Sequence, residues 1–323
     1  MTNKQKIFVS VCSYRDPLLK YTVKSLLEEQ SGEYDIIVGI LEQVVKEDSL
    51  EASHLELIKS NNIRYKRIDP EFSDGVGWAR CINSWQMTDE EYYYQIDSHM
   101  LFDKDWDKFL VEDYKRGVEL TGSDRIIIDA NCKLFGVNAE SGVPIKYPLT
   151  VTCMVKYYAF QDNYLLGPHG DWQDPTEDIN PAIHLCAGNL FTHADWVHNV
   201  GINPYTAFDG EEQILVLKSF AAGYYMFHPR EIHCYHYIDT AKYITKRWVD
   251  PVVPCERYSE SINRSIEELA KLIKILPPEI LEQYRKYSGV DYLNRKLERR
   301  AITSTVYLPD NVVDTWTIDD RSD

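Results

Sequence analysis

Long apolar runs and paired cysteines are both missing from this sequence. No apolar segment approaches the roughly 18–20 residues that span a membrane, and the apolar segment 7–12 is too short for the core of a signal peptide. The 7 cysteines are odd in number, widely spaced and without a Cys-x-x-Cys, which argues against a disulfide framework or a zinc knot. We therefore expect a cytoplasmic, reducing setting and no membrane partner.

Positive charge is also scarce. Lys and Arg total 35 against 51 Asp and Glu, so the formal net charge is −16, which disfavours non-specific binding to nucleic acid or to an anionic membrane. The hydrophobic (44%), aromatic (12%) and charged (27%) fractions are those of globular proteins and exclude extended disorder. A chain of 323 residues forms one large domain or two small ones.

Short β-rich apolar segments alternate with helical periodicities along the first 240 residues. Strands are predicted at 7–12, 35–41, 63–68, 92–96, 125–129, 184–192, 224–228 and 232–237. Helices are predicted near 17–31, 49–60, 77–85, 105–120 and 210–222. This order is typical of an α/β fold with a mostly parallel sheet, which binds ligands beyond the carboxyl ends of its strands.

Two regions depart from this alternation. Periodicity weakens between 131 and 169, where Pro, Gly and Tyr predict loops and hairpins. Beyond residue 240, amphipathic helices are predicted at 261–275 and 279–287, followed by an acidic, β-rich tail at 303–323. We therefore predict a main domain at 1–240 and a C-terminal helical extension at 241–323 that packs on it.

An Asp-x-His motif follows the predicted strand 92–96. If the backbone stays extended, Asp97 and His99 project from the same face and can bind one divalent ion. Mixed oxygen and nitrogen ligands suit Mn²⁺ better than Ca²⁺. We predict His236 as the third ligand because it alternates with large aromatic residues, and His228 and His233 are its competitors. The alternative is a polar loop that binds no ion.

An acidic segment precedes the predicted helix 210–222. It contains Asp209, Glu211 and Glu212. One interpretation is structural: Asp209 caps the helix, and the glutamates favour its first turn. The other is functional: a carboxylate faces an acceptor hydroxyl as a base or an orienting group.

Several motifs together resemble a known family. They are residues 9–16 (VSVCSYRD), 77–80 (GWAR), 94–99 (YQIDSH), 281–284 (LEQY) and 287–291 (YSGVD). This combination is similar to glycosyltransferase family 60, typified by the cytoplasmic enzyme that adds GlcNAc to a hydroxyproline of Skp1. A more distant likeness is to polypeptide GalNAc-transferases, which have an Asp-Ser-His-like metal motif, a Gly-Glu segment and a later His ligand.

The resemblance implies a GT-A fold, that is, a Rossmann-like mixed sheet flanked by helices, with the catalytic domain at 1–240. It also implies a UDP-sugar donor, Mn²⁺ and retention of the anomeric configuration. The metal would be held by Asp97, His99 and His236. The uridine would contact Ser13, Tyr14, Arg15 and Asp16. Glu211 or Glu212, with Asp209 nearby, would contact the sugar or the acceptor, while the leaving diphosphate takes the acceptor proton.

Three donor-site residues have a second interpretation each. Arg80 would reach the diphosphate or steady the carboxylates, or it forms a surface salt bridge. Trp78, like Trp172 and Trp196, would stack on the sugar or base, or it belongs to the core. Gly188 would let the sugar approach the backbone, or it is a strand bulge.

The predicted function is metal-dependent, retaining transfer of a GlcNAc-like sugar from a UDP-sugar to an acceptor hydroxyl, for example on a protein. A different acceptor would be hydroxymethylated pyrimidine in phage-type DNA, with a cationic stretch made by Lys242, Lys246, Arg247 and Arg257. Two functions of another class compete with transfer: UDP-sugar binding without transferase activity, and metal-dependent hydrolysis of phosphate esters.

Overall fold

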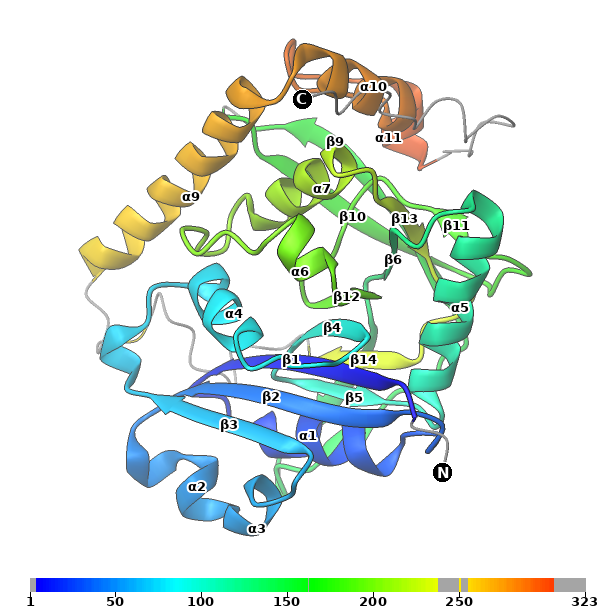
Figure 1. Ribbon diagram of the computed structural model, residues 1–323. Coiled ribbons are helices and arrows are strands. Elements are labelled where there is room, and N and C mark those ends of the chain that lie inside the picture. Colours follow the sequence, from blue (N-terminus) through cyan, green and yellow to red (C-terminus); the bar gives the residue numbers. More distant parts are fainter. Residues whose placement is uncertain (1–3, 162, 238–249, 251–254, 305–323) are drawn as a thin grey trace.

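The computed structural model describes residues 4–161, 163–237, 250 and 255–304. Its centre is a mixed eight-stranded sheet with helices packed against it (Figure 1). Four parallel strands form one half: β3 (Ile63–Ile68), β2 (Asp35–Gln43), β1 (Lys6–Tyr14) and β4 (Tyr92–Asp97). The other half contains β12 (Asn189–His193), β6 (Ile126–Asp129), β13 (Tyr225–His228) and β11 (Asn180–Pro181).

The sheet is mixed because β12 runs antiparallel to both of its neighbours, β4 and β6. The predicted mixed sheet flanked by helices is therefore confirmed. The predicted strand at 184–192 is wrong in its first half, since β12 begins only at Asn189. The backbone N–H of Cys186 donates to the buried carboxylate of Asp129 instead of to a neighbouring strand, which keeps this segment out of the sheet.

Helices connect the parallel strands, as the sequence pattern predicts. They are α1 (Leu19–Glu28), α2 (Leu50–Ser53), α3 (Leu55–Ile58), α4 (Val76–Ser84) and α5 (Trp106–Thr121), with short 3₁₀ turns η1 (Lys46–Asp48) and η2 (Pro70–Phe72). The predicted helix at 49–60 is divided in two at His54, whose φ of −139° is not helical. In the second half, α6 (Trp196–Asn199) and α7 (Glu211–Ala221) follow β12.

A second, four-stranded sheet lies next to the first. Its order is β5 (Met100–Phe102), β14 (Cys234–Tyr237), β7 (Lys133–Val137) and β8 (Pro144–Lys146). The antiparallel hairpin of β9 (Thr152–Phe160) and β10 (Leu166–Gln173) completes the region predicted as loops and hairpins. The pairing of β14 with β5 brings a segment that is distant in sequence to the end of β4.

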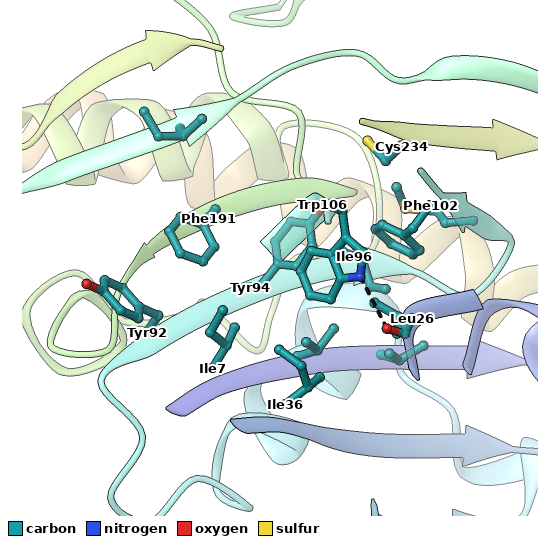
Figure 2. Close-up of a cluster of buried hydrophobic side chains, with 14 of the residues drawn as sticks. Ile7, Leu26, Ile36, Tyr92, Tyr94, Ile96, Phe102, Trp106, Phe191 and Cys234 are labelled. Atoms are coloured by element: carbon teal, nitrogen blue, oxygen red, sulfur yellow. Dashed lines mark hydrogen bonds between the residues drawn. The ribbon is translucent and has the colours of Figure 1, made fainter. Parts of the chain in front are cut away.

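The strand β4 is buried on both faces, which explains its nearly continuous apolar and aromatic sequence. On one face, Tyr94 stacks on Trp106 with ring centroids 5.5 Å apart, and the indole N–H of Trp106 donates to the carbonyl of Leu26 at 3.2 Å (Figure 2). On the other face, Tyr93 stacks on the fully buried Trp196. Trp196 is therefore a core residue, which corrects its interpretation as a sugar-stacking group.

The C-terminal segment is helical, with α9 (Cys255–Ile275), α10 (Pro278–Ser288) and α11 (Arg299–Thr303), and with the short strands β15 (Val290–Asp291) and β16 (Lys296–Leu297). Leu269 of α9 and Tyr284 of α10 are buried in the same cluster as α7. The Tyr284 hydroxyl donates to the carbonyl of Ile183 at 2.8 Å. The predicted domain boundary and most of the predicted acidic tail lie outside the described residues. Among the described helices, none combines the length and apolarity needed to cross a bilayer.

Candidate functional site

A cavity of about 570 Å³ opens at the carboxyl ends of the parallel strands. It is lined by Tyr14 at the end of β1, Gln43 at the end of β2 and Asp97 at the end of β4. The carboxyl ends of neighbouring parallel strands share one edge, so residues distant in sequence meet there. The strand order thus predicts the position of this cavity correctly.

The three predicted metal ligands lie together at this edge. Ligand atoms of Asp97, His99 and His236 are all within 4.8 Å of one another. His99 follows β4 directly, and His236 reaches the same place because β14 pairs with β5, with His236 opposite Met100. The rings of His99 and His236 are 4.5 Å apart.

The competing histidines have other roles. His228 is fully buried; its Nδ1 donates to the Asp129 carbonyl at 2.9 Å, and its Nε2 accepts the Val155 N–H at 3.2 Å. This pair of bonds requires a neutral imidazole, and burial lowers the pKa of His228 to about 4. His233 stacks on Phe109 at 4.1 Å. Neither histidine contributes to the Asp97 cluster.

Hydrogen bonds orient the Asp97 cluster. Nδ1 of His99 donates to Oδ2 of Asp16 at 2.7 Å, and the Ser98 hydroxyl donates to the same oxygen at 2.6 Å. A carboxylate that holds one ring nitrogen is the usual support of a metal-binding histidine, because it directs the other nitrogen at the ion. Asp16, predicted to contact uridine, lines the cavity, but its carboxylate holds His99.

The electrostatics of Asp97 favour its ionised form. Burial raises the pKa of Asp97, but the hydrogen bond from His236 and the charge of Arg80 outweigh burial and hold the pKa below its usual range. A carboxylate oxygen and two imidazole nitrogens are a ligand set that suits Mn²⁺ and similar ions. The donor set and its supporting carboxylate therefore fit a divalent metal.

Arg80 joins this cluster to the acidic segment of α7. Its Nη2 donates to Asp97 at 2.9 Å and its Nη1 to Glu211 at 2.7 Å, and its side chain is only 4% exposed. Arg80 therefore does not form a surface salt bridge; it holds the carboxylates of Asp97 and Glu211 in place. Burial raises the pKa of Glu211 although Arg80 opposes this shift. Within the described part of the chain, Oε1 of Glu211 has no hydrogen-bond partner.

The remaining acidic residues of the segment differ in exposure. Glu212 is half-buried; its Oε2 lies 3.2 Å from Nε2 of His184, and its Oε1 accepts the Ala187 N–H at 3.1 Å. Asp209 is exposed at the cavity. The interpretation of Asp209 as a helix cap is wrong, because Gly210, with φ +83°, occupies the N-cap of α7 and no side chain caps it.

The predicted donor-site residues divide into two groups. Tyr14, Asp16, Arg80 and Gly188 line the cavity, whereas Ser13, Arg15 and Trp78 do not. Gly188 is explained by its neighbour: an added Cβ would lie 2.8 Å from Cγ of Asp97 and closer still to Oδ2. It is not a bulge, since it precedes β12.

The residues outside the cavity have clear positions. The prediction that Trp78 stacks on the sugar or base is wrong. Ala79 and Arg80 follow Val76 by three and four residues, so these three side chains form the cavity face of α4, and Trp78 lies on another face. Arg15 pairs with Asp250, with Nη1 to Oδ2 at 2.8 Å. The hydroxyl of Ser13 is buried and makes no hydrogen bond within the described residues.

Most residues that line the cavity are absent from the sequence-based prediction, and Gln43 and His184 are two polar residues among them. Gln43 is 4% exposed; its Nε2 donates to the Ser13 carbonyl at 3.2 Å, and its Oε1 has no partner in the described ranges. The sequence signal that could have identified Gln43 is its position at the end of a strand, but the predicted strand stops at residue 41. His184 is the first residue of the predicted strand 184–192, and its contact with the distant Glu212 leaves no sequence signal.

Comparisons with known proteins bear on the family and the fold of the chain. A model of the family described as "Glycosyltransferase (GlcNAc)" matches residues 48–283, more than two thirds of the chain. A search of curated proteins finds no match. The crystal structure of GalNAc-T7 with UDP, GalNAc and Mn²⁺ is similar, with a TM-score of 0.57 and 12% identity over 93% of this chain.

This chain spans about half of that GalNAc-T7 chain, 53% of its length. The structure of S. aureus TarS 1–349 with UDP-GlcNAc has a TM-score of 0.52 and 14% identity, covering 90% of this chain and 72% of that one. Both likenesses show the GT-A fold. The family match leads to one conclusion: the chain belongs to the glycosyltransferase (GlcNAc) family.

Proposed function

We propose that this enzyme transfers a GlcNAc-like sugar from a UDP-sugar to an acceptor hydroxyl, that it requires Mn²⁺ or a similar ion, and that it retains the anomeric configuration. The convergence of Asp97, His99 and His236 within 4.8 Å at the carboxyl end of β4 is the observation that carries the proposal. The related fold of GalNAc-T7, solved with UDP, GalNAc and Mn²⁺, supports it. The motif resemblance supports a place in glycosyltransferase family 60.

Asp97, His99 and His236 would hold the metal ion, which when bound supplies positive charge against the diphosphate leaving group. Asp16 keeps His99 in the orientation that ligation needs. Arg80 fixes the Asp97 carboxylate and at the same time compensates the charge of Glu211. The histidines must be neutral to act as ligands, so donor turnover should require a pH at which they are deprotonated.

The nucleoside would lie against the ends of β1 and β2. Tyr14 lines this part of the cavity, and Gln43 presents a buried carbonyl oxygen without a partner among the described residues. A buried acceptor without a donor is costly, and a ligand N–H can satisfy it. The imide N–H of uracil is such a donor, so we assign the base to Gln43.

The sugar and the acceptor would lie between Gly188 and the acidic segment of α7. Glu211 lines the cavity, and its buried Oε1 has no partner within the described residues. Glu212 is held by His184 and by the Ala187 N–H. We propose that Glu211 contacts the sugar and that Glu212 orients the acceptor hydroxyl, with Asp209 at the entrance. The leaving diphosphate takes the acceptor proton, so no enzymic nucleophile is required.

The proposed acceptor is a hydroxyl on a protein. The competing acceptor, modified DNA, rests on a cationic stretch of which Lys242, Lys246 and Arg247 lie outside the described residues. The fourth residue, Arg257, donates to the carbonyl of Glu71 at 2.6 Å. The net charge of the whole chain, −16, also disfavours DNA. Cytoplasmic localisation stays a prediction.

The test is release of UDP from UDP-GlcNAc and related donors, with Mn²⁺ or with a chelator, in the wild type and in Asp97→Ala. We expect loss of at least about 100-fold in both the chelated enzyme and the variant, because the charge on the leaving group is then uncompensated. Asp195→Ala, at a side chain that is 69% exposed, is the matched control and should keep full activity. Unchanged UDP release in Asp97→Ala and in chelator would refute the metal assignment.

A further inference from the structure

A second cluster of metal-binding groups lies in the cavity wall. His184, Cys186 and Glu212 each offer a ligand atom, and these atoms lie within 4.8 Å of one another. His184 and Cys186 are buried in the segment before β12, and Glu212 comes from the first turn of α7. We propose that these three residues form a second cation site that selects a thiophilic ion such as Zn²⁺ and through which that ion inhibits the enzyme.

The separation of the groups matches such a site. Nε2 of His184 and Oε2 of Glu212 are 3.2 Å apart. Two ligands at about 2.0–2.1 Å from a tetrahedral zinc ion are separated by roughly 3.3 Å. In such a site the thiolate of Cys186, with a Sγ–zinc bond of about 2.3 Å, lies roughly 3.6 Å from each of the other two ligand atoms. In this structure its Sγ is within 4.8 Å of both, and a side-chain rotation can supply the difference.

Each ligand also has a partner that orients it. Nδ1 of His184 lies 2.7 Å from the Tyr157 hydroxyl, and Oε1 of Glu212 accepts the Ala187 N–H. The thiol of Cys186 donates to Oδ1 of Asn131 at 2.5 Å, and rotation of this amide would let its N–H₂ donate to the thiolate once the proton is lost. Such supporting bonds are what metal ligands usually have, because they set the direction of the ligating atom.

Ion binding requires two proton movements, and each proton has a place to go. The thiol of Cys186 releases its proton to solvent, and the imidazole of His184 moves its proton from Nε2 to Nδ1. Nδ1 then donates to the Tyr157 oxygen, and the Tyr157 hydroxyl turns to the Ile183 carbonyl, which lies 3.4 Å away. A sulfur, a nitrogen and an oxygen ligand together favour Zn²⁺ over Mn²⁺, whereas the Asp97 cluster has no sulfur.

The position of the second cation site explains why the ion would inhibit sugar transfer, given the function proposed above. His184 and Glu212 line the cavity, so a fourth coordination position faces the ligand space. Zinc there would hold the carboxylate that we assign to the acceptor. The carbonyl of Gly188, two residues after Cys186, accepts the Asp97 N–H at 3.2 Å, so the second site shares a wall with the first.

Co²⁺ is the probe that separates the two sites, because only a thiolate ligand gives a near-ultraviolet charge-transfer band. The metal-free full chain is titrated with Co²⁺ alone. The band should appear in the wild type, persist in Asp97→Ala, and disappear in Cys186→Ser. Cys132→Ser, at a thiol that lies 3.4 Å from Cys234 and outside the cluster, is the control and should keep the band.

Activity provides the second readout. Zn²⁺ should inhibit Mn²⁺-dependent UDP release, and the inhibition constant should rise at least about tenfold in His184→Gln, whose amide is a poor zinc ligand. Absence of the thiolate band in the wild type, or its persistence in a folded Cys186→Ser, would overturn the proposal. A thiolate band in a chain without UDP release would refute the proposed function and leave the second site standing.

Discussion

Gly188→Ala tests whether the position of the Asp97 carboxylate limits the reaction. An added Cβ would lie 2.8 Å from Cγ of Asp97, where ordinary carbon contacts begin at 3.4 Å. The backbone at Gly188 has no positive φ, so alanine is compatible with its conformation. The substitution therefore acts on one neighbouring side chain and not on the chain path.

The expected magnitude follows from the displacement. The carboxyl carbon must move by about 0.6–1 Å to reach the usual contact distance. Asp97 is held by Arg80 at 2.9 Å and by His236 at 3.2 Å, so this movement breaks or stretches both bonds. A misplacement of about 1 Å costs roughly 100-fold in rate, or about 2.7 kcal/mol in barrier height. The loss of a charged hydrogen bond lowers the free energy of unfolding by about 1.5–3 kcal/mol.

Two measurements separate an effect on metal binding from an effect on turnover. Mn²⁺ affinity in the absence of donor is measured by electron paramagnetic resonance, and UDP release is measured at saturating Mn²⁺. Both should fall in Gly188→Ala. The matched control is Gly167→Ala, since Gly167 also lines the cavity and an added Cβ there meets nothing within 4 Å. The control should stay within about twofold of the wild type.

Wild-type Mn²⁺ affinity in Gly188→Ala would refute the reasoning, because it would mean that Asp97 yields to the methyl group without losing its function. Equal losses in Gly188→Ala and Gly167→Ala would also refute it, since the effect would then come from filling the cavity and not from moving the carboxylate.

Three further predictions concern charge, base recognition and pH. Arg80→Met should lower the free energy of unfolding by about 3–5 kcal/mol in urea titrations, because it leaves Glu211 and Asp97 without their buried cation, and Arg80→Met/Glu211→Leu should recover much of this loss without recovering activity. Gln43→Leu should raise the KM for the UDP-sugar about tenfold in steady-state assays, and it should also lower the Tm by a few degrees because it removes the buried hydrogen bond to the Ser13 carbonyl. The pKa of His228 is about 4 in the folded chain, against 6.5 when unperturbed, so the unfolded chain binds more protons between these values. The free energy of unfolding should therefore fall as the pH drops from 6.5 to 4, by up to about 1.4 kcal/mol per pH unit, and less in His228→Gln; equal pH profiles would contradict this.

Local patterns predict most of the α/β fold. The alternation of apolar runs with helical periodicity locates β1 to β4, α1, α4, α5 and α7, because strands and helices have different residue periods. The Asp-x-His spacing predicts two groups of one metal site, since residues two apart on an extended chain share a face. For His236, the residue types around it are the only signal in the sequence.

The order of the elements and the residue types at each strand end can therefore be predicted from local patterns. Which distant groups meet depends on the folded chain: His236 reaches Asp97 through the pairing of β14 with β5, and Arg80 bridges β4 to α7. The same holds for His184 and Glu212, which lie 28 residues apart in sequence. Local periodicity depends on neighbours along the chain, whereas these contacts depend on long-range strand pairing and packing, which no short segment encodes.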